Sequence, residues 1–561
     1  MKIIASILLF IFYSISVINA QFTTDVSKNT LVCNESDVSI ADCVSSTTTC
    51  GKTYVAYIEY DNSGTWILKL QLLDEQGNKV FQTGSIVLEN VGTMNFTAER
   101  QIAITHDEKE NAIVAFSNWG AGVQLSVYKV NNQGIVIASH NNISGGYGIC
   151  PNLAKLPNNE TLISWYNSGT VATSSLQKLE ADGKLAWISA KTIEYECEKL
   201  VPLNNGDCYL ISSDPIIGTA GYGYGFAQLI DNDGNKKWSK WTAISTLSHS
   251  TVYTAEFSCL VGANQELIVA NTYFYGGFGR AAYIQNIDQN GNILWGVDGK
   301  LLCADPALNY QLYVRITENP SSGEFCAVFG AKDYNDPKQK LYLQKISSSG
   351  NLLLGSGGLM LIDDSYDPNL CDLQRCGENY SLLYLATASN GSNPKNNNLL
   401  LLKFDDQGSV LKEEEINSNN GDKAPLATIS NQPTNGQTVI VFPELRNNKV
   451  QLFAQNSTCE SAIGCNAAKK LFIPNVFTPN NDGFNDEFEI ILEGYKINQF
   501  QIFNRWGELV FSKTDNSKSW NGKKQNTKED AVSGTYFFVL DIEELDSKEN
   551  SHHTGNVSLF R

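Results

Sequence analysis

A short turn built around glycine recurs seven times along this chain, and no other feature constrains the fold as strongly. The glycines stand 49 to 59 residues apart, at Gly77, Gly134, Gly183, Gly234, Gly291, Gly350 and Gly408. An apolar residue stands four positions before each of them. Five repeats have glutamine six positions before the glycine (Gln71, Gln177, Gln228, Gln285 and Gln344), and three have tryptophan four positions after it (Trp187, Trp238 and Trp295). Self-similarity at such a period is typical of repeat architectures.

The residues around each glycine predict a β-hairpin. Segments such as Asp231 to Asn235 begin with Asn or Asp, and glycine takes the positive φ that other side chains resist. The apolar segment before the turn and the short segment ending in tryptophan are expected to be antiparallel strands. A third strand is expected upstream, as at residues 54–60, and a fourth between repeats, as at 101–104. Four strands in some fifty residues indicate a β-propeller blade.

The number of blades follows from how the repeat region ends. Residues 438–442 and 450–453 look like an eighth, unfinished hairpin. A closed ring commonly completes its last blade with a strand from the other end of the domain, and residues 22 to 42 are expected to supply it. We therefore predict an all-β fold with a seven- or eight-bladed β-propeller over residues 21–465, eight being favoured. The segments resemble those of secreted bacterial propellers, which implies an architecture and no activity.

Length, charge and the first residues set the broad class of the protein. The 561 residues exceed one compact core, so two or more domains or a repeat array are expected. A net charge of −18 disfavours nucleic acid as a partner. Lys2, the apolar stretch 3–17 and Ala20 predict a signal peptide over residues 1–20. No later segment approaches the roughly 20 apolar residues of a membrane span, so no transmembrane segment is expected after cleavage.

Export would place the thirteen cysteines in an oxidising compartment, where structural disulfides are expected. Cys197 and Cys208 flank a short excursion between two strand-like runs, which suits a cross-strand bridge. Five further cysteines lie near the two ends of the repeat region and are candidates to tie those ends together: Cys33, Cys43, Cys50, Cys459 and Cys465. No CxxC pair exists and Cys371 and Cys376 lack a nearby histidine, so no metal site is predicted.

A ligand is expected at the loops that join the second and third strands of each blade. These loops project from the end of the ring opposite the glycine turns, and the turn end is expected to be flat. Aromatic rings beside amide and carboxylate groups suit sugar rings or extended peptides. The candidate ligand-binding residues are Trp119, Trp165, Tyr166, Tyr222, Tyr224, Tyr273, Tyr275, Arg280, Asp333 and Tyr334. Packing of the same aromatics at the blade ends is the alternative.

No catalytic residue is predicted. The three histidines of the repeat region stand alone in sequence, and no nucleophile elbow, P-loop or zinc-protease motif occurs. Residues 61–66 come closest to the box of propeller sialidases, but the spacing from Asp61 to Gly64 is one residue too long and no second copy follows. No cofactor is expected. Calcium at oxygen-rich turns, such as 231–234 or 480–486, stays open, although turn chemistry explains the repeated version better.

The last ninety residues carry an ordered set of motifs. They are Phe477, Thr478, Pro479, Asn480, Asp482, Gly483, Asn485 and Asp486, then Arg505, Trp506 and Gly507, then Trp520 and Gly522, and finally Gly534. This set resembles the gliding motility-associated C-terminal domain, the type B sorting domain of the type IX secretion system. One departure is Asn504, where the family usually has Asp; its amide is expected to fill the same turn role.

The resemblance implies a small Ig-like β-sandwich over residues 470–561 that is read by the type IX translocon, so the protein is expected to be secreted or held on the outer-membrane cell surface. The leading hypothesis is a non-catalytic propeller that binds an extracellular glycan, peptide or protein ligand. One alternative is a propeller hydrolase or lyase acting on polysaccharide. Another is a structural component of the adhesion or gliding machinery.

Overall fold

The computed structural model describes most of the chain, in segments separated by short gaps. The described residues are 29–33, 38–61, 63–81, 84–93, 101–119, 122–167, 173–215, 222–247, 249–250, 257–274, 279–336, 338–363, 366–376, 378–388, 398–416, 427–429, 437–446, 449–458, 470–480, 486–493, 495–513, 519–525, 527, 529–544 and 550–561. The predicted signal peptide, Cys459 and Cys465 lie outside them.

The repeats form antiparallel blades, each numbered here in chain order. Blade 1 consists of β2 (Val38–Thr47), β3 (Thr53–Asp61), β4 (Thr65–Leu73) and β5 (Ile86–Thr93). Blade 2 consists of β6 (Ile102–His106), β7 (Ala112–Asn118), β8 (Gln124–Val130) and β9 (Val136–His140). Blade 3 consists of β10 (Ile149–Lys155), β11 (Thr161–Asn167), β12 (Thr173–Leu179) and β13 (Lys191–Ile193), with the 3-10 turn η1 (Pro157–Asn159) after β10.

Blades 4 to 6 form one thirteen-stranded sheet, in which β18 (His249–Ser250) joins blade 4 to blade 5 and a bridge from Arg280 to Tyr310 joins blade 5 to blade 6. Blade 4 consists of β14 (Glu196–Pro202), β15 (Cys208–Pro215), β16 (Tyr222–Ile230) and β17 (Thr242–Ala243). Blade 5 consists of β19 (Ser258–Val261), β20 (Leu267–Phe274), β21 (Arg280–Ile287) and β22 (Lys300–Leu301). Blade 6 consists of β23 (Tyr310–Asn319), β24 (Glu324–Lys332), β25 (Lys340–Ile346) and β26 (Leu359–Ile362).

The last two blades complete a ring of eight within the described residues. Blade 7 consists of β27 (Tyr366–Cys376), β28 (Asn379–Ala388), β29 (Asn398–Phe404) and β30 (Val410–Glu415). Blade 8 consists of β31 (Thr428–Ile429), β32 (Gln437–Arg446), β33 (Lys449–Thr458) and the N-terminal β1 (Thr30–Leu31). The first strands of the blades contact one another in cyclic order, and β31 contacts β2 to close the ring.

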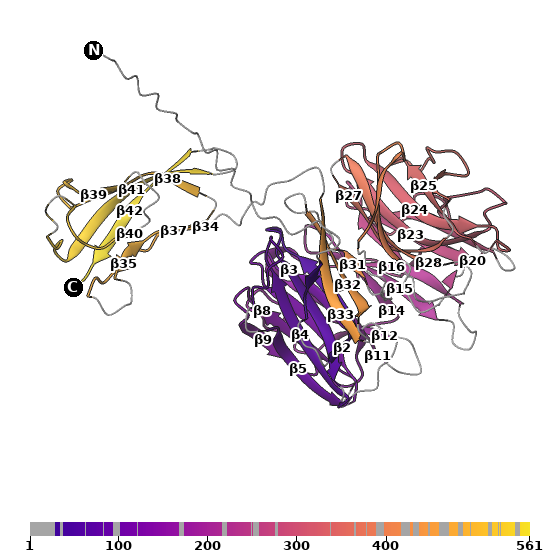
Figure 1. Cartoon of the computed structure of the whole chain (residues 1–561), viewed down its shortest axis with the longest axis horizontal. Coiled ribbons are helices and arrows are strands. Elements are labelled where there is room, and N and C mark those ends of the chain that lie inside the picture. The colour runs from indigo at the N-terminus through magenta and orange to yellow at the C-terminus, as the bar shows by residue number, and fades with distance from the viewer. Residues whose placement is uncertain are drawn as a thin grey trace, which may run out of the picture.

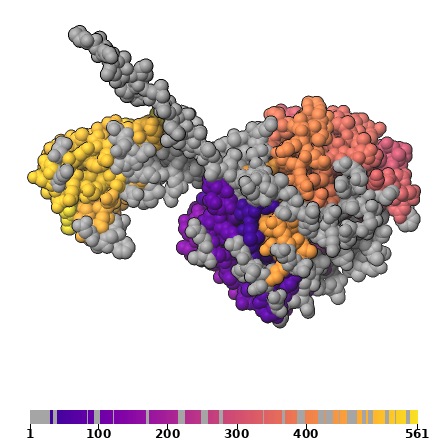
Figure 2. Space-filling view, viewed as in Figure 1, coloured from indigo at the N-terminus to yellow at the C-terminus, as the bar shows by residue number. Residues whose placement is uncertain are grey.

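The ring closes through a strand from the beginning of the chain, as the sequence predicted. Thr30 lies opposite Ala454 in antiparallel register, and the indigo N-terminal strands lie beside the orange strands of blade 8 (Figure 1 and Figure 2). Asn29 fastens this strand, because its Nδ2 donates to Gln455 Oε1 at 2.7 Å while its Oδ1 accepts from Arg446 at 3.2 Å. The prediction of an eighth blade is therefore confirmed.

The repeated glutamine holds the chain that follows each glycine turn. Gln228 is buried on the third strand of blade 4, its Nε2 donating to Trp238 O at 3.3 Å and its Oε1 accepting from Trp238 N at 3.1 Å. Gln177 makes the same two contacts with Trp187. One glutamine side chain therefore satisfies both backbone groups of the tryptophan, while the residue before it still pairs with the third strand, as Lys237 N does with Leu229 O at 2.7 Å.

The repeated glycine and tryptophan meet between neighbouring blades. Gly234 has a φ of 76°, and a Cβ there would lie 2.6 Å from the Trp187 ring of the preceding blade. Trp238 lies against Gly291 in the same way, and Trp295 against Gly350. The prediction that the segment ending in tryptophan is a strand is wrong. After the turn a single β-bridge forms, such as that between Ile230 and Lys236, and the indole ring of the tryptophan then packs on the next blade.

The predicted bridge between Cys197 and Cys208 is also absent. Cys197 lies opposite Ser212, whereas Cys208 lies opposite Pro202, so the register separates the two thiols along the strands. Both are buried and unbonded. Cys33 and Cys43 do join a core cluster with side chains of blade 8, which places them where the ends of the ring meet. The other cysteine pairings stay predictions.

The C-terminal module, yellow in Figure 1, is a separate small β-structure. A five-stranded sheet runs in the order β35 (Val476–Phe477), β42 (Asn550–Leu559), β41 (Gly534–Glu544), β38 (Tyr495–Phe503) and β39 (Leu509–Lys513). Two short pairs complete it: β34 (Lys470–Phe472) with β37 (Ile491–Glu493), and β36 (Phe488–Glu489) with β40 (Ser519–Trp520). Aromatic residues from both layers, among them Phe488, Phe500 and Trp520, fill the core between them.

Candidate functional site

The ring has two ends with different local structure. Each glycine turn follows the third strand of its blade, and the connection from first to second strand lies at the same end, which we call the turn end. The loops between second and third strands lie at the opposite end, which we call the loop end, because neighbouring strands are antiparallel. The predicted ligand-binding residues that the structure describes belong to the loop end or to strands that lead to it.

Four side chains from blades 5 and 6 come together at the loop end. Arg280 begins β21 and Tyr310 begins β23, and the two residues lie side by side in a parallel bridge. The Arg280 guanidinium carbon lies 5.2 Å and Lys332 Nζ 5.6 Å from the Tyr310 ring centre. Tyr334, with 45% of its surface exposed, meets Tyr310 edge-on at 5.8 Å. We call these four residues the cation–aromatic cluster.

Asn309 fixes the backbone of this cluster. Its carbonyl accepts from Arg280 N at 3.0 Å, and its Oδ1 accepts from Tyr334 N at 2.8 Å. Asp333 shapes the same loop, since its Oδ1 accepts from Asn335 N at 2.8 Å. Sequence reasoning named Arg280, Asp333 and Tyr334 but missed the other three residues. Tyr310 and Lys332 stand at strand ends rather than inside a loop, so a search restricted to loops passes over them.

Two predicted ligand contacts are wrong because the side chains belong to the core. Trp165 is 1% exposed and lies in a cluster with Ile113, Val127 and Leu179. Tyr273 is 2% exposed and meets Tyr283 edge-on at 5.8 Å. Neither ring offers a face to a ligand from solvent, which is the packing alternative that the sequence left open.

The remaining predicted ligand-binding residues lie outside the cation–aromatic cluster or have side chains that the structure does not describe. Trp119 is half-buried at the end of β7, with Tyr147 edge-on at 6.1 Å, and its buried Nε1 has no hydrogen-bond partner. Tyr166 is half-buried near the end of β11. Tyr222 and Tyr224 have their backbones in β16, but their side chains lie outside the described part of the chain, as does all of Tyr275. The ligand contacts of these residues stay predictions.

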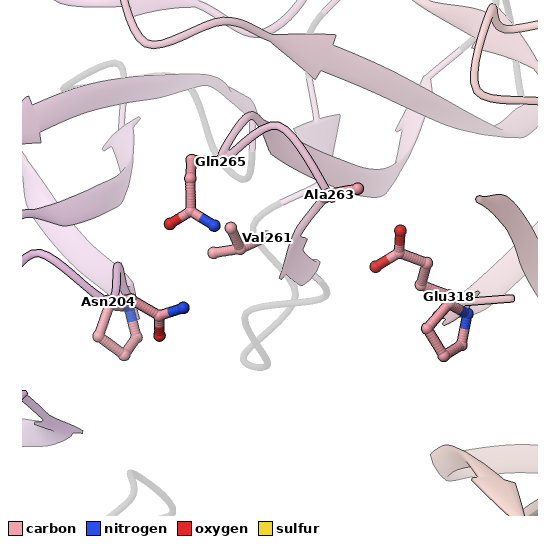
Figure 3. A pocket seen from close by; sticks show the side chains of 8 residues that line it. Asn204, Val261, Ala263, Gln265 and Glu318 are labelled. Carbon is pink, nitrogen blue, oxygen red and sulfur yellow. The ribbon is translucent and has the colours of Figure 1, made fainter.

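The turn end is hollowed, contrary to the flat surface that the tight turns led us to expect. A cavity of about 350 Å³ lies where the first strands of blades 4, 5 and 6 end. Figure 3 shows Asn204, Val261 and Gln265 on one side of it and Glu318 on the other. The expectation was wrong because the turns between first and second strands, as at Val261 to Gln265, rise beside the glycine turns and enclose a space.

Glu318 is the acidic group of this cavity. Partial burial raises the pKa of its carboxyl above the usual value, and the nearby negative charge of Glu266 raises it further, while a hydrogen bond from the Ala263 backbone opposes both. An acid so placed favours cationic or hydrogen-bonding neighbours over anions. Glu266 and Glu318 therefore place two carboxyl groups at the turn end of blades 5 and 6, whereas Arg280 and Lys332 place two cations at their loop end, beside Asp333.

No group of three or more His, Cys, Asp or Glu side chains in the described residues has the arrangement of a metal site. His106 is half-buried beside Ser46, and desolvation lowers its pKa to about 4, with Lys155 contributing. In the repeated turns the aspartate has a structural role: Asp231 Oδ1 accepts from the backbone N of Asp233 and Asn235 at 3.0 and 2.8 Å. Calcium binding stays untested.

The motif residues of the C-terminal module have two roles. Phe477 and Trp520 are core residues, and Gly522 takes a φ of 74° beneath Pro479. Arg561 ties these segments together, because it donates to Gly522 O at 2.9 Å and to Pro479 O at 3.4 Å. The other described motif residues are Thr478, Asn480, Asp486, Arg505, Trp506, Gly507 and Gly534, while Asp482, Gly483 and Asn485 lie outside the described segments.

The turn at Asn504 behaves as the sequence predicted for an amide in place of Asp. Asn504 Oδ1 accepts from Trp506 N at 3.0 Å and from Glu508 N at 2.9 Å, and Gly507 takes a φ of 80°. Trp506 is 72% exposed, with the Arg505 guanidinium 4.2 Å from its ring centre. This turn therefore presents an aromatic ring and a cation to solvent.

Comparison with known proteins finds solved structures of low similarity to this chain. The WD40 domain of SCAP from fission yeast is similar at 10% identity and a TM-score of 0.42, over 77% of this chain and 98% of that one. The β-propeller domain of the Trilobed protease from Pyrococcus furiosus is similar at 9% identity and a TM-score of 0.36, over 68% and 98%. Puromycin hydrolase is similar at 11% identity and a TM-score of 0.39, over 76% of this chain, which spans only 61% of that enzyme.

These likenesses concern the fold alone and say nothing of a ligand. No curated protein has a sequence that matches this chain. No helix in the described residues is long and apolar enough to cross a membrane. A family model for the CHU_C Type IX secretion signal domain matches residues 471–559, which implies export to the cell surface or the extracellular space. This stretch of the chain is a type IX secretion signal domain, and an eight-bladed propeller precedes it.

Proposed function

We propose that the chain is an exported β-propeller that binds an acidic polysaccharide at its loop end. The observation that carries the proposal is the cation–aromatic cluster, in which Arg280 and Lys332 lie over one tyrosine ring and Tyr334 stands exposed beside it. Tyrosine rings provide flat apolar faces for sugar rings, and the two cations provide partners for carboxylate groups along a polyuronate.

The charge of the protein makes this cluster distinctive. Net charge is −18, so an acidic polymer is repelled by most of the surface and gains most from a place where cations gather. Lys332 forms no ion pair with any residue in the described segments, and its ammonium is therefore available to a ligand. A propeller that holds polysaccharide without cutting it suits a cell-surface destination, and a structural part in adhesion remains a further hypothesis.

Retention on polygalacturonate tests the proposal. The full exported chain should be retarded in gels that contain this polymer and not in gels with neutral dextran. The double variant R280Q/K332Q removes both charges and should weaken binding about a hundredfold, since each charge-assisted hydrogen bond contributes roughly 1.5 kcal/mol or more. Equal retardation of the variant and the parent would contradict the proposal.

The same experiment separates binding from catalysis. If the protein shortens polygalacturonate or releases reducing ends, the alternative of a polysaccharide hydrolase or lyase replaces the binding hypothesis. Binding without change in polymer length over many hours supports a non-catalytic role. A parallel measurement with a protein or peptide ligand is unnecessary for this distinction, because only polymer length is compared.

Export through the C-terminal module is tested by deletion. A chain that lacks residues 470–561 should accumulate inside the cell envelope while its ring stays folded. The ring is checked by its far-ultraviolet spectrum and by polygalacturonate binding. Delivery of the shortened chain to the surface at the parent level would show that the module is not needed for export.

A further inference from the structure

An ion pair made by a lysine of the third strand recurs at the turn end of the blades. In blade 6, Lys345 stands five residues before the turn glycine, and its ammonium lies 2.8 Å from Glu324 at the start of the second strand. Blade 3 repeats this pair with Lys178 and Glu160 at 3.3 Å. In both blades the lysine comes one residue before the apolar position of the repeat, and the glutamate comes at the start of the facing strand.

The lysine also reaches the glycine turn of the next blade. Lys345 Nζ lies 2.7 Å from Asp406, which stands two residues before Gly408 in blade 7. Lys129 of blade 2, at the same repeat position, donates to Ala181 O of the blade 3 turn at 2.8 Å and pairs with Asp107 at 2.8 Å. The ammonium groups of Lys129 and Lys345 are thus each held by an acid of their own blade and an acceptor of the next.

Blade 5 keeps the acceptors of this arrangement and lacks the lysine. Asn286 faces Ile268 where Lys345 faces Cys326 in blade 6. Glu266 stands where blade 6 has Glu324, and Ser348 stands where blade 7 has Asp406. A cavity of about 300 Å³ lies at this position, and Glu266, Asn286 and Ser348 are among the residues that line it.

Two side chains that can accept hydrogen bonds, Asn286 and Glu266, line this cavity. Asn286 is 3% exposed, and its Oδ1 is buried without a hydrogen-bond partner. Glu266 is 9% exposed, and its Oε2 accepts from the Asn264 backbone at 2.7 Å. A buried acceptor without a partner costs stability, so a donor bound here would be stabilising. Asn264, Gln289, Asn290 and Ser348 form an exposed polar rim.

We propose that this cavity binds a primary ammonium group, which takes the place that the lysine ammonium occupies in blades 2, 3 and 6. An ammonium has three donors and no acceptor. The Glu266 carboxylate, Asn286 Oδ1 and the backbone carbonyl of Ser348 offer three acceptors, which match the acid and the next-blade acceptor around Lys129 and Lys345. The site lies at the opposite end of the ring from the cation–aromatic cluster and is independent of it.

The ammonium can come from a lysine side chain of a partner protein or from an amino sugar. Two probes distinguish these sources: Nα-acetyl-lysine methylamide, with a slim four-carbon stem, and glucosamine. Nα-acetyl-norleucine methylamide has a comparable stem without the charge and serves as the matched control. Calorimetric titration of the full chain with each probe should give binding for at least one amine and at least tenfold weaker binding for the norleucine compound.

Two substitutions test the assignment of residues. In N286K the protein supplies its own ammonium, as blade 6 does, so the amine should no longer bind and thermal stability should rise. In E266Q the charged acceptor is lost, and the amine should bind about tenfold more weakly, as expected for a charge-assisted hydrogen bond. The variant K345N should create a second amine site in blade 6, doubling the binding stoichiometry.

The proposal fails if neither amine binds at concentrations up to tens of millimolar, or if the norleucine compound binds as well as its lysine counterpart. It also fails if N286K binds the amine as the parent does. Retained binding of polygalacturonate by N286K would show that the ring is folded, so loss of amine binding could not be attributed to unfolding. A cavity that holds only water would give the first of these results.

Discussion

The two ends of the junction between blades 5 and 6 differ in charge and in construction. At the loop end, Arg280 and Lys332 lie close to the half-buried ring of Tyr310, and Tyr334 is exposed beside them. At the turn end, Glu266 and Glu318 lie near two cavities whose walls also hold buried amide and apolar side chains. The same pair of blades therefore has two cations around Tyr310 at one end and two carboxyl groups beside cavities at the other. The ring can meet ligands of opposite charge on opposite sides.

The comparison also separates what the repeat specifies from what it leaves free. Every element of the repeat pattern acts at the turn end, where glutamine, glycine and tryptophan join each blade to its neighbour. We therefore expect substitutions at the turn end to change stability, and substitutions at the loop end to change binding.

The largest expected effect is the loss of the blade 6 lysine. K345A leaves half-buried Glu324 and Asp406 without their shared partner and should lower the free energy of unfolding of the ring by about 3 to 4 kcal/mol, because two charge-assisted hydrogen bonds are lost together. The loop-end control K332A removes no ion pair within the described residues and should cost less than about 0.5 kcal/mol. Urea titration followed by tryptophan fluorescence measures both, and equal costs would remove the distinction between the two ends.

A smaller effect is expected from the repeat glycine. Gly350 combines a φ of 84° with the Trp295 ring 2.7 Å from where a Cβ would lie. G350A should therefore cost about 3 kcal/mol, roughly 1 for the left-handed backbone and 2 for the displaced ring. Gly296 has a φ of 94° and no neighbour within 4 Å, so G296A should cost about 1 kcal/mol. Similar costs for the two variants would show that the tryptophan contact contributes little.

Salt should separate the two binding reactions. The cation–aromatic cluster is partly exposed, so raising ionic strength from about 0.05 to 0.5 M should weaken polygalacturonate binding about tenfold. Amine binding in the blade 5 cavity should weaken less than about threefold, because buried charges are screened less. Calorimetry at four salt concentrations gives both slopes. If the affinity for the amine depended more steeply on salt than the affinity for polygalacturonate, the amine site could not be the more buried of the two.

The smallest effect concerns Glu318. Its carboxyl pKa is raised above the usual 4.5 in the folded protein, chiefly by burial and then by Glu266. The folded state then binds the proton more tightly than the unfolded state, so stability falls as pH rises from below 4.5 through the folded pKa. E318Q should raise the melting temperature slightly at pH 7 and leave it unchanged at pH 4. An equal gain at both pH values would exclude the charge as its cause.

Much of the fold could be predicted because the repeated residues are those that join neighbouring blades. The spacing of Gly77 to Gly408 predicts the blades, and the unpaired hairpin after residue 437 predicts closure from the N-terminal side. The sorting motifs around Phe477 and Trp520 predict the C-terminal module. These signals are strong because each depends on a local requirement, such as a positive φ or a buried aromatic ring.

The sites were harder to predict because they depend on which blades become neighbours. Trp165 and Tyr273 stand beside glycine-rich loops in sequence, yet their strands are buried on both faces. The predicted bridge from Cys197 to Cys208 failed because a bulge and the strand register move the two residues apart. Asn286 is visible in the sequence as a departure from lysine. The cavity at this position can be recognised only from the structure, which places Glu266 and the turn of the next blade beside Asn286.

The most direct test of the account is one crossed titration. Oligogalacturonate is titrated into the parent protein, R280Q/K332Q and N286K, and the affinities are compared by calorimetry. The account predicts a loss of about a hundredfold in R280Q/K332Q and an unchanged affinity in N286K, because the ligand binds at the loop end. Equal affinity in all three proteins, or a loss confined to N286K, would contradict the central claim that the loop end of blades 5 and 6 binds acidic polysaccharide.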